Sequence, residues 1–308
     1  MTYLYKLYGL QVQSVLCIPN AEVYVSSRES TELVDVKITW GLVGMEGLDN
    51  PLVTTSCYQA SANEFWMTIP TLARFSVQNG NTILIDKMPG VDEDSLRVFL
   101  MAVCFQVLLT QRKYLVLNGY ALKQGNTGFA VLGWQGLAYY MLMAEFIKRK
   151  NALWGGSYFI LDKQGRALAG AAQIDVSAQV VSYLGLDISG LKTLRPGMNK
   201  YPIPLEQQNV LGALKLERIY LLKTHQQADI RVCPVEDEEK ANTLQAYLKT
   251  NLLYGLPETE GILADYEKTL NSIQLITIFL PVTGLKLRVL ADSIENDVTM
   301  RGVNHAVI

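Results

Sequence analysis

"FAVLGWQGLAYYML", residues 129–142, joins a short apolar run to an amphipathic run through two glycines. The apolar residues are typical of a buried strand, and residues 137–150 have the pattern of a helix that ends in basic side chains. A second short apolar run, at 158–162, is typical of another buried strand. Strand, turn, helix and strand between 128 and 162 predict a βαβ unit, which demands a right-handed crossover.

The glycine turn has the spacing of a phosphate-binding loop without its reactive side chains. Such a loop has the pattern G-x-x-x-x-G-K-[ST], in which lysine contacts the phosphates and the hydroxyl binds magnesium. Counted from Gly133, the last three positions are Ala138, Tyr139 and Tyr140. A cation clamp and positioning are nearly all that a protein contributes to phosphoryl transfer. The sequence therefore predicts that the chain is not a conventional kinase.

Composition excludes several classes of function. The chain has 308 residues, 49% hydrophobic and 18% charged, with a net charge of −2. These values predict a soluble globular protein, and the absence of a basic tract predicts no nucleic-acid partner. No apolar run reaches the roughly 18 to 20 residues that span a bilayer, so no membrane partner is expected. Scattered cysteines and a start without signal-peptide features predict a cytoplasmic protein, and two histidines are too few for a histidine-based metal site.

The pattern of apolar residues changes along the chain. Residues 3–85 alternate in strand fashion and predict a β-rich region, with residues 5–12 as one strand. Beyond it the pattern predicts an α/β domain, so we expect a β-rich N-terminal region at 1–88 and a second domain at 89–308. The elements expected after residue 88, apart from the βαβ unit, are helices at 92–112, 236–253 and 257–272 and strands at 114–118 and 275–279.

The order of segments resembles the HPr serine kinase-like proteins, in particular the compact relatives found beside bacterial natural-product genes. Four segments carry the resemblance: "YKLYGLQVQS" at 5–14, the run from "LARFSVQ" to "YAL" at 72–122, "GLDISGLKTLRPGMNKYPIPL" at 185–205, and "ERIYLLK" at 217–223. The resemblance implies a P-loop kinase-like core, similar to the HPr kinase C-terminal domain, after the β-rich region.

The same resemblance implies a degenerate phosphate loop. The family's loop lysine falls on Tyr139 and its magnesium hydroxyl on Tyr140. Its paired aspartates correspond to residues 156–160, which contain no carboxylate, and Asp162 is expected to begin a turn. Lys200 matches a basic position of the family that would face the transfer site. No metal or cofactor is therefore expected.

Three functions stay open. The chain is a pseudokinase that binds a peptide, a metabolite or a partner biosynthetic enzyme; or a repurposed cofactor-free enzyme of cyclase or isomerase type; or an atypical NTP-dependent kinase. Fold alone does not decide among them. A homo-oligomer is also left open.

Any ligand is expected at the carboxyl ends of the sheet strands. Candidate catalytic residues are Tyr139, Tyr140 and Lys200. The alternative is that Tyr139 and Tyr140 fill the cleft and close it. The predicted binding residues of the cleft are Asn118, Trp134, Gln135, Tyr139, Tyr140, Tyr158 and Lys200.

Overall fold

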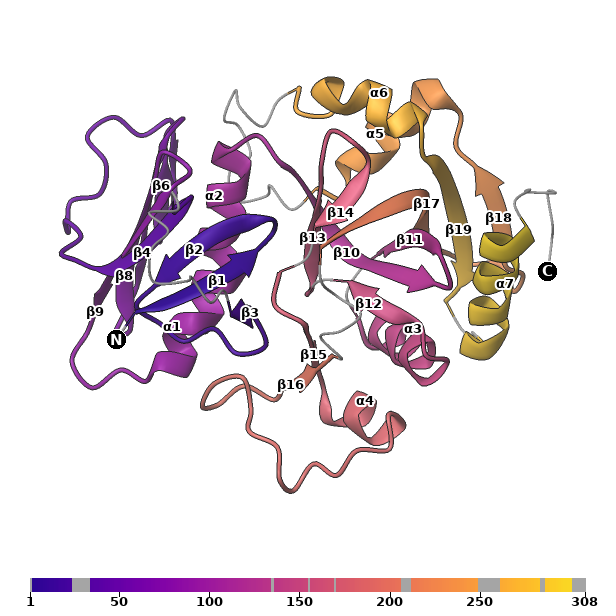
Figure 1. Cartoon of the computed structure of the whole chain (residues 1–308), viewed down its shortest axis with the longest axis horizontal. Helices are drawn as coiled ribbons and strands as arrows, with labels where there is room; N and C mark the ends of the chain where they lie inside the picture. The colour runs from indigo at the N-terminus through magenta and orange to yellow at the C-terminus, as the bar shows by residue number, and fades with distance from the viewer. Residues whose placement is uncertain are drawn as a thin grey trace, which may run out of the picture.

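The computed structural model describes residues 2–23, 34–133, 136–154, 156–168, 170–205, 212–248, 261–282 and 286–300. It is a mixed α/β structure with two large sheets and few helices, as expected in outline (Figure 1). Within these residues no helix is both long enough and apolar enough to cross a membrane.

The first sheet is built from residues 3–87 and has nine strands in the described part of the chain. Its order is β3-β1-β2-β4-β9-β8-β7-β6-β5. Alternate side chains of these strands are buried, which follows from the two-residue period of a strand. The strands are β1 (Tyr3–Leu7), β2 (Leu10–Ser14), β3 (Glu22–Val23), β4 (Val36–Trp40), β5 (Val53–Thr54), β6 (Tyr58–Ala60), β7 (Glu64–Ile69), β8 (Ala73–Gln78) and β9 (Thr82–Lys87).

A helical segment packs on this sheet. It consists of α1 (Glu93–Phe99), the π-helical turn η1 (Leu100–Cys104) and α2 (Phe105–Gln111). Asp92 caps it, because its carboxylate accepts a 2.7 Å hydrogen bond from the Ser95 backbone N–H. Its apolar side chains belong to the same buried core as those of β1 to β9. The predicted boundary between residues 88 and 89 therefore stays a prediction, while the predicted helix at 92–112 is confirmed.

The second sheet has the order β11-β10-β13-β14-β17-β19-β18 in the described residues, and β12 also pairs with β10. Because β11 also pairs with β17, the strands from β11 through β10, β13 and β14 to β17 form a closed circuit of pairing. The strands are β10 (Leu115–Gln124), β11 (Thr127–Leu132), β12 (Ala152–Trp154), β13 (Tyr158–Leu161), β14 (Arg166–Leu168), β17 (Ala213–His225), β18 (Arg231–Pro234) and β19 (Gln274–Pro281).

Helices cover both faces of this sheet (Figure 1). The apolar sides of α3 (Leu137–Lys148), α4 (Ala178–Tyr183) and α7 (Leu287–Met300) share one core, and those of α5 (Lys240–Gln245) and α6 (Glu267–Asn271) share another. Short 3₁₀ turns, η3 (Asp237–Glu239) and η5 (Ala264–Tyr266), precede α5 and α6. A separate two-stranded sheet of β15 (Gln173–Val176) and β16 (Tyr201–Pro204) lies beside α4, which is part of the connection between the two strands.

The predicted βαβ unit is present in modified form. The strand β11, the helix α3 and the strand β13 occur in the expected order, with the short strand β12 between α3 and β13. Both strands run antiparallel to β10, so they are parallel to each other with β10 between them. The direct parallel neighbour of β11 is β17, and β19 extends this parallel core.

Two predicted elements were wrong. Residues 5–12 are not one strand, because Tyr8 and Gly9 both have positive φ (53° and 76°) and turn the chain back as a hairpin. The helix predicted at 236–253 is helical only from 237 to 245 in the described residues. It ends there because the backbone next pairs with β10: Asn118 donates its N–H to the Tyr247 carbonyl at 2.9 Å.

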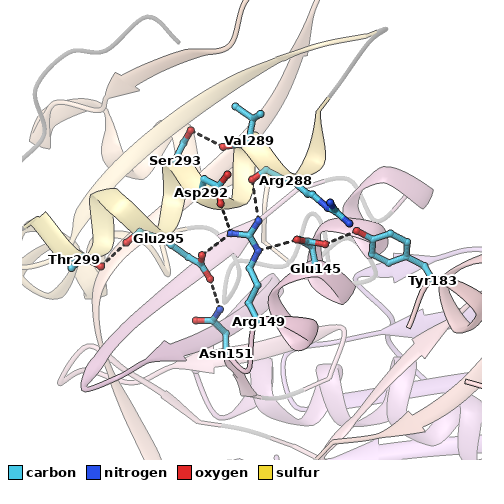
Figure 2. Close-up of polar contacts among 10 residues, drawn as sticks. All are labelled: Glu145, Arg149, Asn151, Tyr183, Arg288, Val289, Asp292, Ser293, Glu295 and Thr299. Atoms are coloured by element: carbon cyan, nitrogen blue, oxygen red, sulfur yellow. Dashed lines mark hydrogen bonds and ion pairs between the residues drawn. The ribbon is translucent and has the colours of Figure 1, made fainter. Parts of the chain in front are cut away.

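A charged cluster ties α7 to the end of α3 (Figure 2). The Arg149 guanidinium donates to Glu145 at 2.9 Å, to Asp292 at 2.6 Å and to Glu295 at 2.8 Å. The Tyr183 hydroxyl and then Arg149 lower the pKa of the Glu145 carboxyl. The cluster is consistent with a fixed C-terminal helix that covers the parallel strands.

Tyr8 joins the two sheets. At the tip of the β1–β2 hairpin its buried ring stacks on Tyr158 of β13, with ring centroids 5.5 Å apart, and meets Phe105 of α2 at 6.0 Å. A Cβ atom at Gly170 would lie 2.5 Å from the Tyr8 hydroxyl oxygen. The absence of a side chain at Gly170 therefore makes room for the ring.

We expect Tyr8→Ala to lower the free energy of unfolding by roughly 3–5 kcal/mol, the usual cost of deleting a buried aromatic ring. The matched control is Tyr3→Ala, which removes a less buried ring from β1 of the same hairpin and should cost clearly less. Urea unfolding followed by circular dichroism measures both. Equal losses in the two variants would contradict the anchoring role of Tyr8.

Candidate functional site

Tyr139, at the start of α3, closes the turn that follows β11. Its side chain is buried, and its hydroxyl donates to the Val131 carbonyl at 2.7 Å and accepts from the Tyr120 N–H at 3.2 Å. Val131 and Tyr120 are partners in the β10–β11 register, so the hydroxyl bridges the two strands. Burial raises the pKa of Tyr139. A hydroxyl bonded on both sides acts here as a structural bridge.

Tyr140 and Lys200, two of the residues named from the sequence, lie near each other. The Lys200 ammonium is 5.5 Å from the centre of the Tyr140 ring, which is itself buried and packs edge-on against Tyr139. Burial raises the pKa of Tyr140 to about 12. Both tyrosines are therefore neutral at physiological pH. Trp134 and Gln135 lie outside the described residues.

Asn118 and Tyr158 face one another across β10 and β13. The Tyr158 ring turns toward Tyr8, and its hydroxyl donates to the Met101 carbonyl at 2.8 Å. Asp162 begins the next turn, as expected, because its carboxylate accepts from the backbone N–H groups of Gln164 and Arg166 at 2.9 Å each. That these residues and Tyr139, Tyr140 and Lys200 line one cleft stays a prediction.

The space beside the start of α3 is small and apolar. A pocket of about 90 Å³ lies between the first turn of α3, the ends of β17 and β19, and α7. Tyr139 forms part of its wall, together with leucines from all four elements. A pocket of this size is well below the roughly 300–1,000 Å³ of typical ligand sites.

A larger cavity, of about 300 Å³, lies where the two sheets meet. Tyr8, Met101 and Tyr158 form its apolar wall, and the π-helical turn η1 supplies Met101 and Ala102. Such turns are frequent at functional sites. Its polar lining residues are Asn20, Asp94, Arg97, Ser157, Gln173, Asp175, Lys192 and Thr193.

Three polar side chains of this lining form a chain of hydrogen bonds. The Asn20 amide donates to the Gln173 side-chain oxygen at 3.1 Å, and the Gln173 amide donates to Asp175 Oδ1 at 2.8 Å. The backbone holds Asn20, at the start of this chain of hydrogen bonds, because Ala172 N–H donates to the Asn20 carbonyl at 2.8 Å. We call Asn20, Gln173 and Asp175 the polar relay.

Asp175 is the perturbed acid of the cavity. Burial raises the pKa of its carboxyl above 3.8, and the Gln173 hydrogen bond and the Lys200 charge oppose this rise only in part. Burial raises the pKa of Tyr120 on β10, and the nearby Tyr140 and Asp175 add to this rise. Its hydroxyl makes no hydrogen bond within the described residues. Perturbed acids in cavities are characteristic of functional sites.

The cations of the cavity differ in how they are held. Arg97 donates to the Cys17 carbonyl at 2.6 Å and pairs with Asp94, so its charge is largely satisfied. Lys192 is exposed at the rim and makes no ion pair with a described residue. Within the described chain no group of histidine, cysteine and acidic side chains could hold a metal ion.

Sequence reasoning missed the polar relay. Gln173 and Asp175 alternate with the apolar Ile174 and Val176, which is a weak signal for a strand with one polar face. Nothing in the sequence marks Tyr8 or Asn20 as neighbours of Asp175, because the three come together only when the hairpin docks on the second sheet.

No family model matches the chain, and no curated protein matches it. Among solved structures it is similar to the Hpr(Ser) kinase/phosphatase from Coxiella burnetii, at 13% identity and a TM-score of 0.33, over 60% of this chain and 91% of that chain. At these values the similarity carries no information about what the chain binds. The degenerate phosphate loop and the natural-product context stay predictions.

We expect Tyr139→Phe to lower the free energy of unfolding by about 1–3 kcal/mol, because the Tyr120 N–H and the Val131 carbonyl lose their shared partner in a buried site. Tyr58→Phe is the control, since the Tyr58 hydroxyl has no hydrogen-bond partner among the described residues. Urea denaturation compares the two. A Tyr139→Phe loss no larger than that of the control would show that the bridge does not stabilise the fold.

Proposed function

We propose that the chain binds a small molecule in the cavity between the two sheets and does not transfer phosphate. The observation that carries this proposal is a cavity of about 300 Å³ that combines an apolar wall with the polar relay. Ligand sites typically pair apolar walls with a few placed polar groups at this size or above. The proposal includes the P-loop kinase-like core predicted from sequence, as a pseudokinase in a biosynthetic pathway.

The turn at the start of α3 supports the proposal that the chain does not transfer phosphate. Tyr139 stands at the position where a phosphate loop has its lysine, and it is committed to bridging β10 and β11. The adjoining pocket is apolar and measures about 90 Å³. A nucleoside triphosphate needs cations and backbone N–H donors that point at its phosphates, and a small apolar pocket does not suit it.

Two binding experiments test the proposal. Isothermal titration with ATP and magnesium should show no binding; a dissociation constant below about 100 μM, or about 5.5 kcal/mol of binding free energy, would contradict it. In ligand-observed NMR, at least one of three small aromatic probes (benzyl alcohol, benzylamine and benzoate) should bind. Ala102→Trp, which places a large ring over the cavity from an exposed position, should weaken that binding about tenfold or more.

The matched control is Ala246→Trp, an equally large substitution at an exposed position beyond α5. It should leave probe binding unchanged. If no probe binds, or if both tryptophan variants have the same effect, the cavity is not a ligand site and the proposal fails.

A second function, proton transfer without a cofactor, is favoured by Asp175 alone. A carboxyl whose pKa is raised by burial is a suitable general acid or base. The test is deuterium exchange into the methyl group of acetophenone, in which the base removes a proton from carbon and solvent returns a deuteron. If Asp175 acts as this base, the chain should accelerate exchange by about 10²-fold or more and Asp175→Asn should not. No acceleration by the unmodified chain would rule out this proton transfer.

A further inference from the structure

The polar relay has a direction. Each amide donates to the next group, so the relay ends on a carboxyl that accepts from Gln173 through Oδ1. An ionised carboxylate has about four acceptor positions. Gln173 supplies the one hydrogen bond that Asp175 receives from the described residues. The carboxyl therefore lines the cavity with acceptor capacity left over.

Among the described residues, no cation forms an ion pair with this carboxyl. The Lys200 ammonium lies over the Tyr140 ring and acts on Asp175 only at a distance. Arg97 is bound to Asp94 and to the Cys17 carbonyl, and Lys192 is exposed at the rim. Buried carboxylates are normally paired with a cation or a strong donor. A ligand that enters this cavity can supply that partner.

The remaining lining defines the body of that ligand. The aromatic side chains of Tyr8 and Tyr158 and the flexible side chain of Met101 suit an aromatic or aliphatic group. Aromatic rings also attract cations through their faces, so the same wall tolerates a positively charged ligand.

We propose that the cavity takes a compact apolar molecule that carries a primary ammonium group, and that this group donates hydrogen bonds to Asp175. The inference rests on the proposed function and names its ligand class. The ammonium would complete the charge and hydrogen bonding of the carboxyl, while Gln173 and Asn20 hold the carboxyl in position.

The pH dependence of binding follows from the groups around Asp175. These are Gln173 on its own strand, Tyr120 of β10, Tyr140 of α3 and Lys200 just before β16. Asp94, Arg97 and Lys192 lie elsewhere in the cavity. Burial raises the pKa values of both tyrosines, so they stay neutral, and burial also raises the pKa of Asp175 above 3.8. An ammonium ligand prefers the ionised carboxylate. Its affinity should rise as pH rises through the pKa of Asp175 and then level off.

The experiment compares benzylamine, benzyl alcohol and benzoate, which share a ring and differ in one group. Ligand-observed NMR titration should show benzylamine binding at least tenfold more tightly than the other two. Asp175→Asn, which keeps the shape and removes the charge, should weaken benzylamine by about tenfold and change benzyl alcohol by less than about threefold, because hydrogen bonds between charged groups are the stronger ones. Asp265→Asn, at an exposed acid beside α6, is the control and should change neither.

The pH titration of the unmodified chain is an independent measurement that needs no variant. Benzylamine affinity that falls or stays constant as pH rises from 4 to 7 overturns the inference. So does a preference for benzyl alcohol or benzoate, or a benzylamine preference that survives in Asp175→Asn. Those outcomes leave the cavity as a ligand site. If no probe binds, or if Ala102→Trp does not weaken the binding that is seen, both the inference and the proposed function are overturned.

Discussion

The docking of Tyr8 between the two sheets is the contact on which the cavity depends. The β1–β2 hairpin presents the ring at a left-handed position, and the bare backbone of Gly170 admits it. The ring then stacks on Tyr158, whose hydroxyl binds the Met101 carbonyl of the π-helical turn η1. One tyrosine thus connects the first sheet, its helix and the second sheet. The cavity is the space left beside that connection, so the fold and the proposed site have a common origin.

The start of α3 and the junction of the two sheets differ in how far their polar side chains are hydrogen-bonded. At the start of α3 the Tyr139 hydroxyl is bonded on both sides, and the adjoining pocket is small and apolar. At the junction of the sheets Asp175 is half-buried, has a pKa raised by that burial and receives one hydrogen bond from the described residues. Satisfied polar groups stabilise a fold, whereas unsatisfied buried groups are costly and need a reason. This difference directs the functional proposal to Asp175.

Local pattern predicted the elements better than their connections. The helix at α3 and the strand at β19 follow from apolar periodicity, which depends on neighbouring residues alone. The hairpin at Tyr8 was missed because a tyrosine with positive φ is uncommon, so Tyr8-Gly9 does not match the usual Asn-Gly or Asp-Gly turn signal. Tyr140 and Lys200, both named from the sequence, lie near each other, and their role in a site stays a prediction. The sequence could not indicate the polar relay, because Asn20 and Gln173 are 153 residues apart. Contacts of that range are decided by docking of the two sheets and leave no local pattern.

The most direct test is a crystal structure of the chain soaked with benzylamine. We expect the benzylamine ring to lie against Tyr8 and Tyr158. Its nitrogen should lie within about 3.2 Å of the Asp175 carboxylate, the usual limit for such a hydrogen bond. Asn20 and Gln173 should keep their hydrogen bonds. Benzylamine bound beside Tyr139 and Tyr140, with the cavity between the sheets left empty, would contradict the account.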